Sequence, residues 1–142
     1  MRLLFTLTLL AATGCVVNAA DNITTSINDD FQLVAGQSAR LSNENIQIEF
    51  LEVASDSRCG KGEACISEGD AIVRISLRLN SSSEAVELHT ASKEPHSVNF
   101  SDYNIRLVRL DPAAISGRAI SPADYIATFN VSLGAVYNDA IN

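Results

Sequence analysis

Apolar and polar residues alternate along most of the chain beyond residue 30. In the run 71–79 every second residue is apolar, and arginine or serine fills most positions between. A period of two predicts half-buried β-strands, whereas no stretch of about 11 residues or more keeps the spacing of an amphipathic helix. The same alternation predicts strands over 31–34, 38–41, 46–50, 86–90, 98–100, 103–107 and 125–133.

Two features interrupt this pattern. Leu51 and Val53 place apolar side chains on the opposite parity from the preceding run 46–50, which predicts a β-bulge or an exit from the sheet. The longest connection is 111–123, and we expect a single helical turn within it at 113–115. Glycine, proline and asparagine mark the other turns between predicted strands.

Strands that are apolar on one side need only one buried face, which is typical of antiparallel sheets. Seven or eight such strands at short spacing predict an all-β fold, an antiparallel β-sandwich of Ig-like or Greek-key type. A small barrel is the alternative. We expect one β domain over 31–135, followed by a C-terminal tail over 136–142, with Tyr125 as a core residue.

The N-terminal segment is typical of a secretory leader. Met1 and Arg2 precede ten apolar or small residues, a run too short to cross a bilayer, which needs about 20. An ordinary signal peptidase site is predicted after Ala19. Alternatively, the Gly14-Cys15 pair resembles the lipobox of bacterial lipoproteins, in which the cysteine is lipidated and becomes the new N-terminus. We favour this second interpretation, with a signal peptide over 1–14 and a lipidated Cys15 and polar tether over 15–30.

Charge excludes one class of partner. The formal net charge is −7, and it becomes −8 when the leader takes Arg2 with it. An acidic protein without a basic stripe repels phosphate backbones, so we expect no nucleic acid partner. Contact with a membrane is expected only through the lipid anchor.

The chain contains three cysteines. If Cys15 is lipidated or removed, Cys59 and Cys65 remain to pair with each other, and Gly60 and Gly62 let the short segment between them turn back. A disulfide predicts an oxidising compartment outside the cytoplasm. The alternatives are a metal pair or a catalytic thiol, but zinc usually takes about four ligands, and no second cysteine pair or histidine cluster exists.

This cysteine segment resembles one found in a group of small exported bacterial proteins and lipoproteins. In that group an Asp-Ser-Arg-Cys-Pro sequence ends a strand, and a second cysteine precedes a long alternating strand. The matching residues here are Asp56, Ser57, Arg58, Cys59, Cys65, Gly69, Asp70 and Ala71. Gly60 replaces the usual proline, and Ser67 stands where tryptophan is common. The resemblance implies export and a sandwich-like fold, and because the group has no settled activity it implies no catalytic residues.

The cysteine segment also supplies the candidate binding loop, through Asp56, Arg58, Lys61 and Glu63. A constrained loop loses less entropy on binding, as in recognition loops of inhibitors. The structural alternative is that Asp56 caps a turn, Arg58 pairs with a neighbouring carboxylate, and the disulfide ties off the end of a strand.

Two groups of side chains have the chemistry of metal ligands. They are the carboxylates Asp56, Glu63, Glu68 and Asp70, and the histidines His89 and His96 with Glu87. The carboxylates match no known calcium loop, and His89 shares the solvent face of a strand with Glu87, so we expect no metal and no cofactor. No nucleophile elbow or phosphate-binding glycine loop occurs, and we expect no catalytic residues and no enzymatic activity.

These inferences predict a bacterial envelope lipoprotein, anchored at the outer membrane or periplasmic face. Its β domain is expected to bind an envelope protein or a cell-wall component through the disulfide-constrained loop. The alternative is a secreted or soluble periplasmic inhibitor or immunity-type protein that inserts Arg58 or Lys61 into the cleft of an enzyme.

Overall fold

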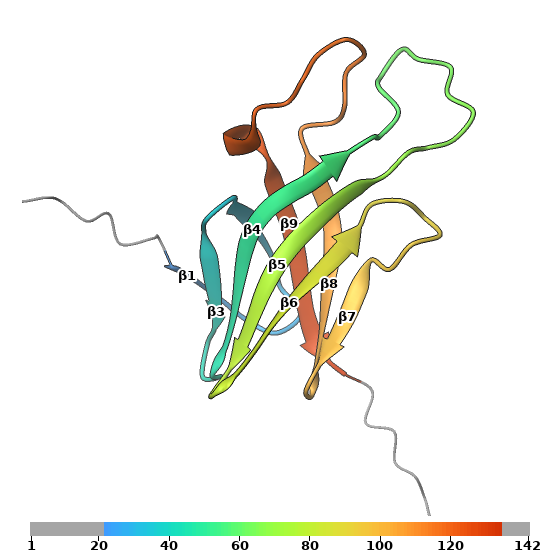
Figure 1. Cartoon of the computed structure of the whole chain (residues 1–142). Helices are drawn as coiled ribbons and strands as arrows, with labels where there is room; N and C mark the ends of the chain where they lie inside the picture. Colours follow the sequence, from blue (N-terminus) through green and yellow to red (C-terminus); the bar gives the residue numbers. More distant parts are fainter. Residues whose placement is uncertain (1–21, 135–142) are drawn as a thin grey trace, which may run out of the picture.

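The structure is a computed structural model that describes residues 22–134. Its strands form two sheets (Figure 1). The first sheet has the order β1 (Asn22–Thr25), β3 (Ser38–Leu41), β4 (Ile46–Asp56), β5 (Ala71–Leu79) and β6 (Ser82–His89). The second has the order β2 (Asp30–Val34), β9 (Ile126–Leu133), β8 (Tyr103–Asp111) and β7 (Ser97–Phe100). All neighbouring strands are antiparallel except β1 and β3, so the predicted antiparallel β-sandwich is confirmed.

The strand β5 shows why the alternation predicts the fold. Ala71, Val73, Ile75 and Leu77 are fully buried, whereas the residues between them keep part of their surface in solvent. The β-strand turns successive side chains to opposite faces, so this sequence buries one face and solvates the other.

The two sheets meet at a cluster of aromatic rings. The ring of Phe129 on β9 lies 6.0 Å from that of Phe31 on β2 and 6.2 Å from that of Phe50 on β4, measured between centroids. The pair with Phe50 has the edge-to-face geometry that aromatic rings favour. Because β4 belongs to one sheet and β9 to the other, Phe129 joins them at the centre of the core.

The strand β4 is bulged where the sequence changes parity. Its register with β5 shifts between Phe50 and Glu52 and again between Val53 and Ser55, which confirms the predicted bulge. The strand stays in the sheet beyond both irregularities and ends at Asp56. The strand therefore places Asp56 at the end of the sandwich where the candidate loop begins.

The sheet begins earlier than the sequence predicts. The polar tether expected over 15–30 includes β1, which pairs in parallel with β3, and Asp30 opens β2. The strand β1 is an edge strand of four residues whose only apolar member is Ile23, so no alternation reveals it. The domain consequently includes residues from Asn22 onward, earlier than the predicted start at residue 31.

The predicted helical turn at 113–115 is wrong. The backbone of Ile115 instead pairs with Lys61 on one side and Arg118 on the other, which requires an extended conformation. A single 3-10 turn occurs later, at Pro122–Asp124. Proline suits the first turn of a helical segment because its φ is fixed near the helical value.

Three predicted segments lie outside the described residues: the signal peptide 1–14, the lipidation site Cys15 and the tail 136–142. Within 22–134, no helix has the length and apolar character needed to cross a bilayer.

Candidate functional site

Three loops gather at one end of the sandwich (Figure 1). We call them the disulfide loop (residues 57–70, between β4 and β5), the β6–β7 loop (90–96) and the β8–β9 loop (112–125). The disulfide loop stands between the other two loops and contacts both of them. Each candidate residue faces one of these two neighbours.

Cys59 and Cys65 form a disulfide, with their Cα atoms 6.0 Å apart. Below it the two arms of the loop extend the β4–β5 hairpin, because the amide of Cys59 donates to the carbonyl of Glu68 at 2.8 Å and that of Ser57 to Asp70 at 2.6 Å. Between these two hydrogen-bonded positions, Gly69 has a φ of +67°, and a Cβ at this residue would overlap the carbonyl of Ser57 in the opposite arm. The disulfide thus closes the tip of a hairpin that backbone hydrogen bonds hold at its base.

The mostly buried side chain of Arg58 connects the disulfide loop to the β8–β9 loop. Its guanidinium meets both carboxylate oxygens of Asp56, at 2.9 and 2.7 Å, and donates to the carbonyls of Leu110 at 2.8 Å and Pro112 at 2.9 Å. The side chains of Arg58 and Asp56 are 14% and 12% exposed. The structural alternative proposed for this pair, in which Arg58 binds a neighbouring carboxylate, is confirmed, and four of the five N–H donors of the guanidinium bond groups of the protein itself.

Asp56 is held ionised by its surroundings. Partial burial by itself would raise its pKa, but hydrogen bonds from Arg58 outweigh that effect, and the hydroxyl of Tyr125 donates a further one at 3.0 Å, so the pKa lies below its ordinary value. Tyr125 is buried immediately before β9, which confirms its prediction as a core residue. Hydrogen bonds among these three side chains therefore connect the end of β4, the disulfide loop and the β8–β9 loop.

Further contacts dock the tip of the disulfide loop onto the β8–β9 loop. The amide of Lys61 donates to the carbonyl of Ala114 at 2.9 Å, and Glu63 accepts hydrogen bonds from the hydroxyl of Ser116 and from the amide of Gly60, the latter at 3.3 Å. Gly60 is buried, and a Cβ there would lie 2.5 Å from the nitrogen of Ser116. Glycine at this position allows the two backbones to touch.

On its other side the disulfide loop is fixed to the β6–β7 loop. One oxygen of Asp70 accepts from the amides of Thr90 at 3.0 Å and Ala91 at 2.9 Å, and the other lies 2.6 Å from Nδ1 of His89. Burial would raise the pKa of Asp70, but these hydrogen bonds lower it further than burial raises it. Glu68 likewise accepts from the amide of Ser92 at 2.6 Å.

The carboxylates weighed as metal ligands are therefore divided between two sides of the loop. Asp56 and Glu63 face the β8–β9 loop, while Glu68 and Asp70 face the β6–β7 loop. The histidine set is also separated, because Glu87 pairs with Arg74 at 2.8 Å on the outer face of the sheet. Among residues 22–134, one group brings three potential ligand atoms together, Cys59, Glu63 and Cys65, and its two sulfurs are joined to each other.

The outer surface of the disulfide loop is apolar at one point that the sequence did not single out. Ile66, next to Cys65, is fully exposed at 109%, and Ile115 on the adjoining loop is 46% exposed. Lys61 is exposed as well. The sequence signal for this exposed position was a large aliphatic residue in the disulfide loop that belongs to no alternating run.

Comparisons with known proteins give no match: no family model, curated protein or solved structure corresponds to this chain.

Proposed function

We propose that this chain is a bacterial envelope lipoprotein whose β domain is a binding module, not an enzyme. In this proposal Cys15 carries the lipid, and the loop end of the sandwich contacts another envelope protein. The disulfide supports a location outside the reducing cytoplasm, since such bonds persist in oxidising compartments.

One observation carries the binding role: the disulfide loop presents a fully exposed Ile66 on a support that is fixed from both sides. Soluble proteins can expose single aliphatic side chains without consequence. Here, however, the loop is held by a disulfide, by Arg58 and by Asp70. A loop ordered in advance loses little entropy when it binds, and a few well-packed side chains at the centre of an interface contribute most of its energy.

The contact residues in this proposal differ from those expected from the sequence. Asp56, Arg58 and Glu63 act as the support, because their polar groups bond the neighbouring loop. Ile66 and Lys61 remain on the outside and form the contact. For the alternative function, an inhibitor that inserts a basic side chain into an enzyme, the exposed Lys61 is the residue that the geometry favours over Arg58.

The anchor is tested by metabolic labelling with palmitate. We expect the parent protein to incorporate the label and to partition with membranes, and Cys15→Ala to lose both properties, because the thiol is the only proposed acceptor. Cys15→Ala protein that still incorporates palmitate, or that still sediments with membranes, would contradict the proposed anchor.

The contact is tested by placing a photo-crosslinking amino acid at position 66 in living cells, with position 133 as the control. Leu133 is also exposed, at 62%, and lies at the opposite end of β9 from the loops. We expect one discrete crosslinked envelope protein from position 66 and none from position 133.

The same pair of positions provides the binding variants. Ile66→Asp is expected to weaken binding of the crosslinked protein by about tenfold or more, because a carboxylate would be desolvated in place of an aliphatic anchor. Leu133→Asp should leave it unchanged, and neither substitution should alter stability by more than about 0.5 kcal/mol. Equal crosslinking from both positions, or unchanged binding by Ile66→Asp, would count against this interface.

A further inference from the structure

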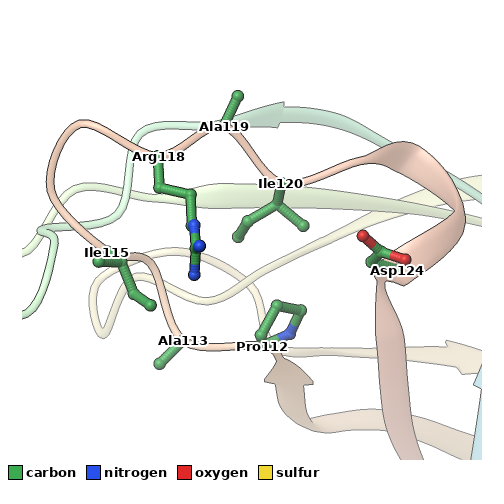
Figure 2. Close-up of a pocket in the computed structure, with 7 residues that line it drawn as sticks. All are labelled: Pro112, Ala113, Ile115, Arg118, Ala119, Ile120 and Asp124. Carbon is green, nitrogen blue, oxygen red and sulfur yellow. The ribbon is translucent and has the colours of Figure 1, made fainter.

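A small pocket lies within the β8–β9 loop, and none of the residues that line it belongs to the disulfide loop. It has a volume of about 270 Å³, and Figure 2 shows the side chains that line it. Pro112, Ala113, Ile115 and Ile120 provide apolar walls, and Arg118 and Asp124 provide opposite charges. Pockets for drug-sized ligands usually measure about 300–1,000 Å³, so this one suits a smaller molecule.

The two charged side chains of the pocket are not paired with each other. In the part of the chain that the structure describes, neither the guanidinium of Arg118 nor the carboxylate of Asp124 takes part in an ion pair or a side-chain hydrogen bond. In Figure 2 the side chains of Ile120 and Pro112 stand between them, and the guanidinium extends into the pocket. An unmatched positive and an unmatched negative group are thus held apart by an apolar surface.

Other acidic groups near Arg118 are already engaged. Asp56 and Glu63 line the adjoining hollow with it, but Asp56 is bonded by Arg58 and Tyr125, and Glu63 by Ser116 and Gly60. The guanidinium therefore keeps its capacity for a bidentate carboxylate contact, the geometry for which arginine is best suited.

The backbone of the pocket is fixed before any ligand arrives. The carbonyl of Pro112 accepts from Arg58, and that of Ala114 accepts from the amide of Lys61 at 2.9 Å. Within the loop, the amide of Arg118 donates to Ile115 at 3.1 Å. Such pre-ordering fixes the backbone from which the lining side chains project and lowers the entropy lost on binding.

We propose that this pocket binds a free aliphatic amino acid as its zwitterion. The ligand carboxylate bonds Arg118, the ammonium group bonds Asp124, and the aliphatic side chain packs on Ile115, Ile120 and Pro112. The site is separate from the Ile66 contact and goes beyond the proposed function, because it recognises a small molecule and not a protein.

The test is a titration of the full-length protein with three probes, followed by amide NMR: leucine, N-acetyl-leucine, which lacks the ammonium charge, and leucinamide, which lacks the carboxylate. We expect leucine to shift the signals of Ile115, Arg118 and Asp124 saturably, and the other two probes to bind about tenfold more weakly or worse. Loss of either charge leaves one protein group without its partner.

Two variants assign the charges. Arg118→Gln should weaken leucine binding by about tenfold or more and leave the residual leucinamide binding unchanged, whereas Asp124→Asn should weaken leucine binding similarly and spare N-acetyl-leucine. Arg40→Gln, an exposed arginine on β3, is the matched control and should bind leucine normally. These side chains are exposed, so the variants are expected to stay folded, which unchanged core signals would verify.

The proposal is overturned if leucine causes no saturable shift up to its solubility limit, or if Arg118→Gln binds leucine as the parent does. It is also overturned if N-acetyl-leucine binds as tightly as leucine, because the pocket would then recognise a carboxylate alone, such as the C-terminus of a peptide. None of these results depends on whether the Ile66 surface binds an envelope protein.

Discussion

An Arg58→Ala variant is expected to lose about 2–4 kcal/mol of its free energy of unfolding. The guanidinium makes four hydrogen bonds, two to Asp56 and one each to the carbonyls of Leu110 and Pro112. Removing it leaves a largely buried carboxylate with only the hydroxyl of Tyr125 and one backbone amide as donors, and it takes the guanidinium donors away from two carbonyls. A buried polar group that loses its partner costs more than the net value of the bond it made. Urea denaturation followed by circular dichroism measures the change.

Arg74→Ala is the matched control for this prediction. Arg74 also contacts two carboxylates, Glu52 at 2.5 Å and Glu87 at 2.8 Å, but its side chain is 40% exposed. Water screens these charges, so the control should lose much less stability than Arg58→Ala. Similar losses in the two variants would contradict the role of Arg58 as the link between the loops.

Gly69→Ala is the second substitution with a large expected effect, a loss of about 2–4 kcal/mol. The left-handed conformation of this residue, φ +67°, disfavours any side chain by about 1–2 kcal/mol. The added Cβ would in addition overlap the carbonyl of Ser57, which lies in the other arm of the hairpin. Because two backbone segments would have to separate, the hydrogen bonds at the base of the disulfide loop should be lost as well.

Gly117→Ala separates the cost of the left-handed backbone from the cost of the overlap with Ser57. Gly117 has nearly the same φ, +69°, but no atom lies within 4 Å of an added Cβ. It should lose only the conformational part, about 1–2 kcal/mol. Thermal unfolding of both variants, together with hydrogen exchange at the amides of Ser57 and Cys59, measures the difference. If the two variants are equally destabilised, the close approach at Gly69 has no energetic role.

The sandwich was predictable because apolar and polar residues alternate along most of its strands. The run 71–79 becomes β5 with the predicted boundaries, and the parity change at Leu51 and Val53 becomes the bulged part of β4. The strand β1 was not predictable, because an edge strand of mostly polar residues buries too little surface to leave a pattern. The extended backbone at Ile115 was missed because one of its partners, Lys61, lies in the disulfide loop, far away in the sequence.

The candidate site was predictable only in its disulfide and its local ion pair. The spacing of Cys59 and Cys65 indicates the disulfide, and Asp56 with Arg58 indicates a local ion pair. The sequence does not show that Arg58 also reaches the carbonyls of Leu110 and Pro112, residues more than 50 positions away. Those contacts arise when β4 and β8 end at the same edge of the sandwich, and they turn an expected contact residue into an internal support.

The early start of β1 limits how far the domain can stand from a lipid anchor. Only six residues separate Cys15 from Asn22, where β1 begins. A fully extended chain covers at most about 3.5 Å per residue, so the linker spans roughly 25 Å. On the proposed lipidation, Asn22 can stand no farther than this from the lipid-bearing residue. A protein bound at Ile66 would then be tethered to the membrane through this short linker and the folded domain, with no long flexible spacer between them.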